Sequence, residues 1–468
     1  MVKIDTLTLN MTKEAFFYSY KEQTQQQEQH VFLESGRVGR YSIAAWNPFV
    51  TLFAKEDGVQ IEERGTTDWQ QGEPLQLLEN YLRQYELSYE EGLPDFQGGA
   101  IGFVSYDYAR RIEKLPALAV DDLHVPDIYF YIFDHWAVFD AMTETVILMK
   151  RSESTMQLEL WREQWEQAAE RGLQDRLFDT TSATQVHLDE SELTVSFVSL
   201  EFERAVQKIQ HYIAQGDVFQ VNLSVRQAKQ LQAPPIAMYE AVRSFNPSPY
   251  MAFIQTPNFA VVSGSPELLV KRRQLELSTR PIAGTRPRGE SGEADQLLAQ
   301  ELIYHEKERA EHVMLVDLER NDLGKVSVYG TVEVDEFMVI ERYSHVMHIV
   351  SNVKGELADG YTNADIIRAM FPGGTITGAP KIRTMEIIEE LEPVRRGIYT
   401  GSIGWIGFNQ DFEFNIVIRT AFIQDDIAYI QAGAGIVIDS IPQNEYIESL
   451  NKAKAMWQAK AMAEEAMK

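Results

Sequence analysis

The stretch IYFYIFDHWAVFDAMTETVILMK, residues 128–150, decides the class of fold. It holds three runs rich in β-branched and aromatic residues, at 129–133, 135–139 and 145–150. The residues DAMTE at 140–144 separate the last two runs and are typical of a turn. The stretch therefore predicts short consecutive strands, and we expect residues 1–150 to be a strand-rich segment.

Working outward, apolar residues at helical spacing alternate with further strand-like runs. The expected helices cover 75–84, 156–171, 199–215, 295–318, a segment from Pro380 to before Pro393, and 445–468. The expected strands cover 250–255, 259–263, 268–272, 401–408, 412–420 and 427–432. No regular strand–helix–strand period is visible, so the pattern favours an α+β fold over a doubly wound sheet.

Composition divides the chain into three parts. The strand-rich residues 1–150 are followed by a polar part, 151–195, with one helix and a linker near 176–193. Residues 196–468 carry most of the motifs with chemical meaning and are predicted to be the catalytic domain.

Charge and residue usage exclude several classes of protein. There are 43 Lys and Arg against 70 Asp and Glu, a net charge of −27, which disfavours nucleic-acid binding. No cysteine occurs, so thiolate metal sites and cysteine nucleophiles are excluded. The N-terminus has no apolar signal core, and no apolar run reaches the length of a membrane span. We expect a cytoplasmic globular protein with no membrane or nucleic-acid partner.

The first chemical motif is the acidic segment HEKERAEHVMLVDLERND, residues 305–322. Glu308 and Glu311 lie three residues apart, so on a helix their carboxylates share one face. With a third carboxylate they would suit Mg²⁺, which prefers oxygen ligands. The alternative is a solvated helix face with ion pairs to Lys307 and Arg309.

Two glycine-rich segments could present backbone amides to an anion. FPGGTITGAPK, residues 371–381, is not a nucleotide-binding loop of the Walker type, so we expect a carboxylate there, or else only a tight turn. YIQAGAGIVIDS, residues 429–440, is interpreted as strand–turn–strand, with Gly433 and Gly435 allowing close approach of a ligand.

Four further side chains complete a candidate site. Arg419 ends an apolar strand, where a guanidinium is costly unless it meets an anion or a structural ion-pair partner. Tyr399 and Lys454 would supply a phenol and a second cation. His345 and His348 face opposite sides of an extended segment, so one of them could be a general base, or a buried core residue. Together these signals describe a site for a small dianion with a carboxylate-held divalent cation.

The order of several motifs resembles the chorismate-utilising enzyme family. They are GSPELL (264–269), RPIAGTRPRG (280–289), ERAEHVMLVDLERND (308–322), YSHVMHIVS (343–351), FPGGTITGAPKIRTMEIIEELEP (371–393), YTGSIGW (399–405), QAGAGIVIDS (431–440) and EYIESLNKA (445–453). Segments 31–43 and 96–113 resemble the subfamilies that aminate chorismate. The resemblance implies a large two-layer sandwich of antiparallel sheets flanked by helices, as in anthranilate synthase component I.

The resemblance also implies roles for individual residues. It places Mg²⁺ on Glu308, Glu311 and Glu448, and the general acid for the departing C4 hydroxyl on Glu267. It places His348 near the enolpyruvyl group. The chorismate-binding groups would be Gly284, Thr285, Thr375 or Thr377, Tyr399, Arg419, Gly433, Ala434, Gly435 and Lys454. Gln220 replaces the lysine that activates water in isochorismate-forming members, and an amide cannot act as a base.

Ammonia is therefore the expected nucleophile. It would come from a glutamine amidotransferase subunit, because this chain has no cysteine to hydrolyse glutamine. Within the family the sequence favours formation of 4-amino-4-deoxychorismate, with anthranilate formation as the alternative. Ala283 stands where some members that form 4-amino-4-deoxychorismate carry a lysine. A non-catalytic anion-binding sensor is the remaining alternative.

A tryptophan pocket is the last feature that the resemblance implies. The matching residues are Leu33, Glu34, Ser35, Tyr41, Asn246, Pro247, Pro249, Tyr250 and Met251. The alternative is that these residues only pack the two halves of the chain together.

Overall fold

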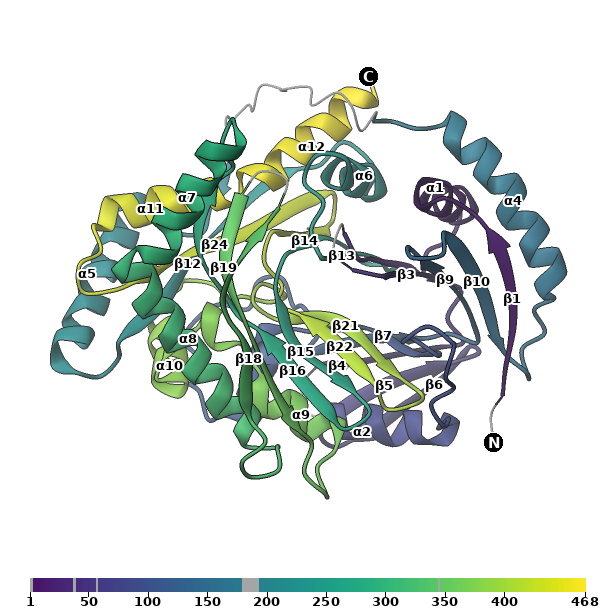
Figure 1. The fold of residues 1–468 in the computed structure, drawn as a ribbon, viewed down its shortest axis with the longest axis horizontal. Coiled ribbons are helices and arrows are strands. Elements are labelled where there is room, and N and C mark those ends of the chain that lie inside the picture. Colours follow the sequence, from purple (N-terminus) through teal and green to yellow (C-terminus); the bar gives the residue numbers. More distant parts are fainter. Residues whose placement is uncertain (1–2, 37–38, 56–57, 179–192, 344–345) are drawn as a thin grey trace.

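The computed structural model describes residues 3–36, 39–55, 58–178, 193–343 and 346–468. Two large antiparallel sheets lie face to face, with helices on their outer sides (Figure 1). This two-layer α+β arrangement confirms the fold expected from the sequence. Among the described residues, no helix has the length and apolarity needed to cross a membrane.

The first sheet runs, in spatial order, β1 Ile4–Asn10, β10 Thr145–Arg151, β9 His135–Asp140, β3 Tyr41–Trp46, β2 His30–Glu34, β13 Tyr250–Gln255, β14 Ala260–Ser265, β23 Thr420–Gln424, β24 Ile427–Ile436, β12 Gln220–Gln230 and β11 Thr194–Val195, with β20 Gly378–Ala379 beside β12. The second sheet runs β17 Ile282–Pro287, β19 Val346–Glu356, β16 Glu276–Arg280, β15 Leu268–Arg273, β22 Phe412–Asn415, β21 Ser402–Gly407, β7 Gly99–Val104, β8 Ile128–Ile132, β4 Val50–Lys55, β5 Gly58–Glu63 and β6 Thr66–Gln71, with β18 Glu333–Arg342 beside β19. Strands from 1–150 and from 196–468 occur in both sheets, so these two sequence segments share one scaffold.

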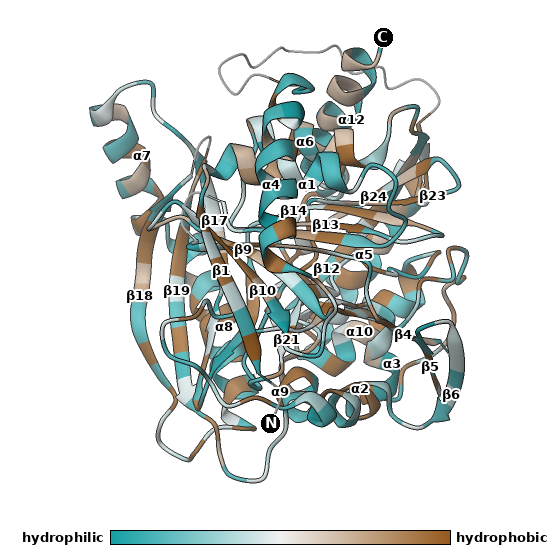
Figure 2. Cartoon of the chain, turned by 90° about the vertical axis from the view of Figure 1, so that its right-hand side faces the viewer, coloured by the Kyte–Doolittle hydropathy of each residue, from teal (hydrophilic) through white to brown (hydrophobic). Residues whose placement is uncertain are grey.

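The helices are α1 Lys13–Gln23, α2 Pro74–Leu82, α3 Ala109–Ile112, α4 Leu158–Gln174, α5 Ser199–Gln215, α6 Pro235–Phe245, α7 Gly292–Tyr304, α8 Glu306–Gly324, α9 Asn363–Met370, α10 Lys381–Leu391, α11 Pro442–Lys452 and α12 Lys454–Ala466. Short 3₁₀ turns follow at Arg83–Tyr85, Tyr106–Tyr108 and Gly374–Ile376. Figure 2 shows α4 turning a largely hydrophilic face outward, as expected of a helix that covers a sheet.

The stretch 128–150 forms strands as predicted, but it divides between the two sheets. Its first run is β8 in the second sheet, whereas β9 and β10 pair as a hairpin in the first. In β8, Phe130 packs toward the helices outside the second sheet, while Tyr129 and Tyr131 pack between the sheets. Because side chains alternate along a strand, β8 contributes both to the core between the sheets and to the core under the outer helices.

Helix α5 has the bounds that its apolar spacing predicts. Phe202, Val206 and Ile209 are buried, and Gly216 ends the helix with a φ of 83°, a left-handed conformation that glycine adopts without strain.

Three sequence expectations were wrong in detail. The predicted helix 295–318 is two helices, because His305 adopts extended backbone between α7 and α8 and its ring caps α8. The predicted helix 445–468 is divided at Ala453 into α11 and α12. The predicted strand 412–420 is interrupted after Asn415, and β23 begins only at Thr420.

Candidate active site

A cavity of about 230 Å³ lies where the first sheet passes into the second. Its lining comes from β19, from α11 and α12, and from the loops before β13 and β23, between β14 and β15 and after β18: Asn246, Pro247, Ser248, Pro266, Tyr343, Val346, His348, Arg419, Lys452 and Ala455. Two cations, Arg419 and Lys452, therefore face the same small space. An anionic ligand is what this charge arrangement favours.

Arg419 is the half-buried cation of the cavity. It lies just before β23 with a φ of 51°, in the left-handed region that is uncommon for arginine. In the described part of the chain its guanidinium has no hydrogen-bonded or ion-paired partner, and burial lowers its pKa. The structural ion pair considered as an alternative is absent there, so the geometry favours an anion clamp.

Lys452, and not Lys454, is the lysine of the cavity. Its Nζ donates to the carbonyl oxygen of Gly433 at 3.0 Å and lies 2.8 Å from Glu448 Oε1. Lys454 is exposed at the start of α12 and does not line the cavity. The sequence expectation chose Lys454 because it did not foresee the break at Ala453, which ends α11 at Lys452 and starts α12 at Lys454.

His348 is a neutral imidazole at the cavity wall. Its Nδ1 lies 3.0 Å from the carbonyl oxygen of Gly284 and 3.0 Å from the hydroxyl of Thr285. Since a carbonyl only accepts, Nδ1 carries the proton, and the buried Nε2 has no partner among the described residues. Burial lowers the pKa of His348 to about 4, with the charge of Arg419 acting in the same direction. The lone pair of Nε2 is available to a ligand. His345 lies outside the described residues.

Glu267 has the properties of a general acid. It lies in the turn between β14 and β15, is only 5% exposed, and its Oε1 has no hydrogen-bond partner in the structure. Burial raises the pKa of Glu267 to about 7, although Thr375, the Ile282 amide and Arg419 oppose the shift. A carboxyl group with this pKa is partly protonated at neutral pH and can give up its proton there.

The acidic face of α8 approaches Gln220 of β12. Gln220 Nε2 donates to Glu311 Oε1 at 3.3 Å, and Glu308 Oε1 lies 3.3 Å from Arg286 Nη1. Burial raises the pKa of Glu311, and the charge of Glu308 raises it further. The two carboxylates therefore lie close enough to repel each other, so the solvated-face alternative does not describe Glu311.

A hard divalent cation fits this donor chemistry, because it would relieve the repulsion between Glu308 and Glu311. The third predicted ligand, Glu448, is about half exposed and is paired with Lys452. Over the residues that the structure describes, no three His, Asp or Glu side chains are gathered into a ready metal site. The three glutamates are thus not preassembled.

Gly433 and Gly435 lie within the strand β24 and not in a turn. Residues 427–436 form one continuous strand, so the strand–turn–strand expectation was wrong. Gly433, Ala434 and Gly435 pair with β12, and β23 pairs with the other edge of β24 only as far as Ile430. A Cβ on Gly435 would lie 2.4 Å from Gln220 Nε2, so glycine is required for Gln220 to reach Glu311.

Gly284 and Thr375 lie near the carboxylates of the site, whereas Tyr399 lies elsewhere. Gly284 has a φ of 66°, and a Cβ there would lie 2.9 Å from Glu308 Oε2. Thr377 donates to the Gly373 carbonyl, whereas the Thr375 hydroxyl is directed toward the carboxyl group of Glu267, so Thr375 is the better candidate of the two. Tyr399 is buried against Arg396 and lines a separate, much smaller cavity.

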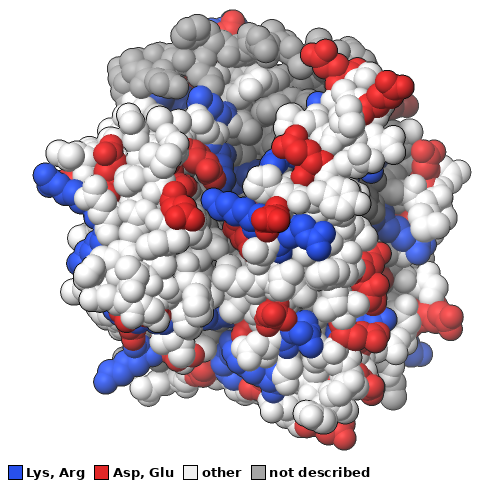
Figure 3. Space-filling model, turned by 60° about the vertical axis from the view of Figure 1, so that its left-hand side comes forward, with Lys and Arg blue, Asp and Glu red and all other residues white. Residues whose placement is uncertain are grey.

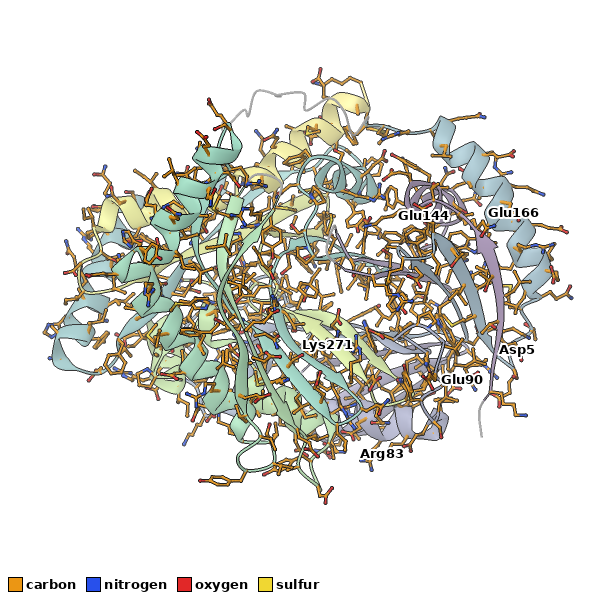
Figure 4. The ribbon with its side chains drawn as sticks, viewed as in Figure 1. Asp5, Arg83, Glu90, Glu144, Glu166 and Lys271 are labelled. Carbon is orange, nitrogen blue, oxygen red and sulfur yellow. The ribbon has the colours of Figure 1, made fainter. Side chains whose placement is uncertain are left out.

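A second, larger cavity of about 540 Å³ is lined by most of the residues predicted to form a tryptophan pocket. These are Leu33, Glu34, Ser35, Tyr41, Pro249, Tyr250 and Met251. Asn246 and Pro247 instead line the cavity of Arg419. Lys271 of β15, labelled in Figure 4, also lines the larger cavity. Pro266 and Tyr343 line both cavities, so one wall separates them.

Sequence reasoning missed Glu319, which lies on α8 and is 3% exposed. It accepts a hydrogen bond from Thr279 at 3.1 Å. Burial raises the pKa of Glu319 to about 8, and the charges of Asp322 and Glu267 contribute. Glu319 follows Glu311 by eight residues, about two helical turns, so helical spacing alone could have placed both on the same side of α8. A second buried carboxyl group therefore lies in the electrostatic range of Glu267.

Comparison with known proteins identifies the family. Residues 16–458 match the family described as chorismate binding enzyme. The chain belongs to this chorismate-binding enzyme family. It is 52% identical to aminodeoxychorismate synthase component 1 of Bacillus subtilis (strain 168), over 97% of each chain. It is 41% identical to anthranilate synthase component 1 of Aquifex aeolicus (strain VF5), over 93% of this chain and 90% of that one.

Solved structures agree with this assignment. Anthranilate synthase component I from Streptococcus pneumoniae TIGR4 is similar with a TM-score of 0.77 and 34% identity, over 91% of this chain and 93% of that one. The isochorismate synthase MenF from Escherichia coli has a TM-score of 0.70 at 19% identity, over 98% and 95% of the chains, a likeness of fold alone. The family resemblance expected from the motifs is confirmed, and this chorismate-binding enzyme has the fold of its relatives.

Proposed function

We propose that this chorismate-binding enzyme replaces the C4 hydroxyl of chorismate by an amino group and forms 4-amino-4-deoxychorismate and water. The similarity to the Bacillus subtilis relative supports this product. The observation on which the proposal depends is that Glu267, buried with a pKa near 7, follows Pro266 in the wall of the Arg419 cavity, and that the charge of Arg419 acts on it. One group can protonate a leaving hydroxyl while the other holds an anionic substrate.

Substrate binding follows from the two cations of the cavity. Chorismate carries two carboxylates, and Arg419 with Lys452 supplies two positive charges. The guanidinium is half-buried, so it loses less water on meeting a carboxylate than an exposed one would. The unpaired backbone edge of β24 beyond Ile430 lies next to Arg419 along the sheet and offers further amide groups.

Proton transfer is assigned to Glu267. Loss of hydroxide from C4 is unfavourable, and a protonated carboxyl group converts the leaving group into water. The nucleophile is ammonia, because the amide of Gln220 has no basic lone pair with which to activate water. A glutamine amidotransferase subunit is the proposed source of ammonia, in line with the component 1 names of the relatives.

Mg²⁺ is the proposed cofactor, with Glu308, Glu311 and Glu448 as the residues that would hold it. Bound there, the ion would neutralise a substrate carboxylate and draw electron density from the ring. The proposed roles of Gly284, Thr285 and Thr375 are to shape the wall beside these groups.

Anthranilate formation is the second candidate, and the neutral imidazole of His348 favours it. Conversion of chorismate to anthranilate and pyruvate requires removal of a ring proton, and Nε2 of His348 is a free acceptor in the described structure. The larger cavity is proposed to take tryptophan, as the matching segments imply.

Product identification tests the proposal. The purified chain is incubated with chorismate, Mg²⁺ and ammonium chloride, and products are separated by liquid chromatography with mass detection. We expect 4-amino-4-deoxychorismate, which a lyase then converts to 4-aminobenzoate. Direct appearance of anthranilate and pyruvate would support the second candidate, and unchanged chorismate would support a sensor.

A further inference from the structure

Arg396 and Glu392 form a buried ion pair in the loop after α10, and the proposed reaction does not use it. Figure 3 shows charged side chains scattered over one face of the molecule, whereas these two residues are 3% and 4% exposed. Nε of Arg396 donates to Glu392 Oε2 at 2.9 Å, and Nη2 donates to Oε1 at 2.8 Å. The attraction between two buried charges often offsets only part of the free energy lost on removing them from water. Stability alone is therefore a poor explanation of the pair.

The other donors of Arg396 reach two backbone segments that carry site residues. Nη2 donates to the carbonyl oxygen of Asn222 at 2.7 Å, and Asn222 follows Gln220 by two residues in β12. Nη1 donates to the carbonyl oxygen of Ile376 at 3.0 Å, in the 3₁₀ turn that carries Thr375. One guanidinium thus connects the strand of Gln220 to the turn of Thr375.

The turn of Thr375 is held by two further contacts. The backbone amide of Asn222 donates to the carbonyl oxygen of Thr377 at 2.9 Å, which is a second link to β12. A Cβ on Gly374 would lie 3.2 Å from the side chain of Leu318 in α8, so the turn also packs closely against that helix. The direction of the Thr375 side chain follows from how this backbone is held.

The orientation of the guanidinium is itself fixed. Its centre lies 4.9 Å from the ring centre of Tyr106 and 5.4 Å from that of Tyr399. Glu392, its partner, also accepts the backbone amide of Ser224 in β12 at 2.9 Å and the Ser224 hydroxyl at 2.7 Å. A lysine ammonium, which is a point charge without a planar fork, could not make all these contacts at once.

We propose that Arg396 is a positioning residue: it holds the turn of Thr375 against β12 and so places the Thr375 hydroxyl at the general acid Glu267. The same contacts fix the strand from which Gln220 reaches Glu311. The inference rests on the proposed function and adds a residue that acts through others. The alternative is an ion pair that only stabilises the fold.

The pH profile separates these two roles. A hydroxyl that donates to a carboxylate favours the ionised form, so the Thr375 contact lowers the pKa of Glu267 against the effect of burial. Loss of the contact should raise the pKa of Glu267 further and move the alkaline fall of kcat/KM to higher pH. A loss of fold stability alone would reduce the amount of active enzyme and leave the midpoint of that fall unchanged.

The test uses the full chain, with rates for chorismate and ammonium chloride measured over a pH series at constant free ammonia. Thr375→Val removes the hydroxyl itself. Arg396→Lys keeps the charge and loses the fork, and Arg396→Met combined with Glu392→Met leaves no unpaired charge buried. The matched control is Arg226→Lys, because Arg226 is a second buried arginine, lies in β12 and is paired with Asp122.

We expect Thr375→Val, Arg396→Lys and the double methionine variant each to move the midpoint upward by about half a pH unit. Adding Arg396→Lys to Thr375→Val should move it no further, since both act through one contact. Arg226→Lys should leave the midpoint unchanged. An unshifted midpoint in Arg396 variants that are folded by circular dichroism would overturn the inference, and so would failure of both Arg396 variants to fold.

Hydrogen exchange separates the inference from the proposed function, because it needs no turnover. Peptides covering residues 371–379 should exchange faster in both Arg396 variants than in the unmodified chain, and Arg226→Lys should not change their exchange. Unchanged exchange in the Arg396 variants would overturn the inference. Faster exchange, together with no ammonium-dependent product from the unmodified chain, would overturn the proposed function alone.

Discussion

The side-chain amide of Gln220 donates a hydrogen bond to Oε1 of Glu311 across 3.3 Å, and so joins β12 to α8 at the proposed cation site. The contact opposes the effect of burial, which raises the pKa of Glu311. Gln220 therefore favours the ionised form of Glu311 and orients it, and its amide cannot itself act as a base. The structure assigns it a positioning role.

Replacing Gln220 by Ala should lower the ammonium-dependent kcat by less than tenfold and raise the Mg²⁺ concentration needed for half activity. Glu311→Gln should lower activity by more than a hundredfold, because a charged oxygen ligand is lost. Steady-state rates across a Mg²⁺ series measure both effects. Equal losses in the two variants would contradict a positioning role for Gln220.

Glu267 should make the reaction rate fall as the pH becomes alkaline. Because burial raises the pKa of Glu267 to about 7, its protonated fraction falls as pH rises above 7. At constant free ammonia, kcat/KM for chorismate should therefore decrease above pH 7. Glu267→Gln should lower kcat by roughly 10²–10⁴ and leave substrate affinity intact, as removal of a general acid does. A rate that keeps rising to pH 8.5 at constant free ammonia would argue against Glu267 as the acid.

The two neighbouring lysines make a matched pair. Both side chains are exposed, but Lys452 lines the cavity and contacts Gly433, whereas Lys454 does not line it. Lys452→Ala should raise the KM for chorismate at least tenfold, which corresponds to a loss of about 1.4 kcal/mol of binding. Lys454→Ala should leave KM within twofold. The reverse order in a chorismate titration would restore Lys454 as the binding residue.

Glu448 tests the cation assignment. Its carboxylate is about half exposed and paired with Lys452, so Glu448→Gln should leave the fold and the thermal midpoint unchanged. We expect the Mg²⁺ requirement to rise at least tenfold and turnover to fall strongly. Rates over a Mg²⁺ series, with circular dichroism as the control for folding, provide the measurement. Ordinary activity at ordinary Mg²⁺ would remove Glu448 from the proposed ligands.

Glu319 should make stability depend on pH. Its pKa is raised from 4.5 to about 8 in the folded protein, so the folded chain binds more protons than the unfolded chain between these values. The free energy of unfolding should therefore fall as pH rises through this window, by at most about 1.4 kcal/mol per pH unit for one group. Glu319→Gln should make that fall shallower in urea titrations at pH 5.5 and 8.5. An unchanged slope would mean that Glu319 is ionised throughout.

Local spacing was enough to predict much of the secondary structure. The apolar positions of α5 and its end at Gly216 follow from helical geometry alone, because residues three and four apart share a face. The same rule brought Glu308 and Glu311 together. It missed the breaks at His305 and Ala453, since each lies inside a continuous periodic pattern and depends on how the flanking helices pack.

The sequence by itself determined the class of fold, the family and the types of residue available for the site, because strand and helix periods and motif order are local properties. The tertiary structure alone decided that Lys452 and not Lys454 lines the cavity, that Arg419 is half-buried without a partner among the described residues, and that β8 joins a different sheet from β9 and β10. Burial, charge proximity and strand register join segments that lie far apart in the sequence. No local pattern specifies those distances.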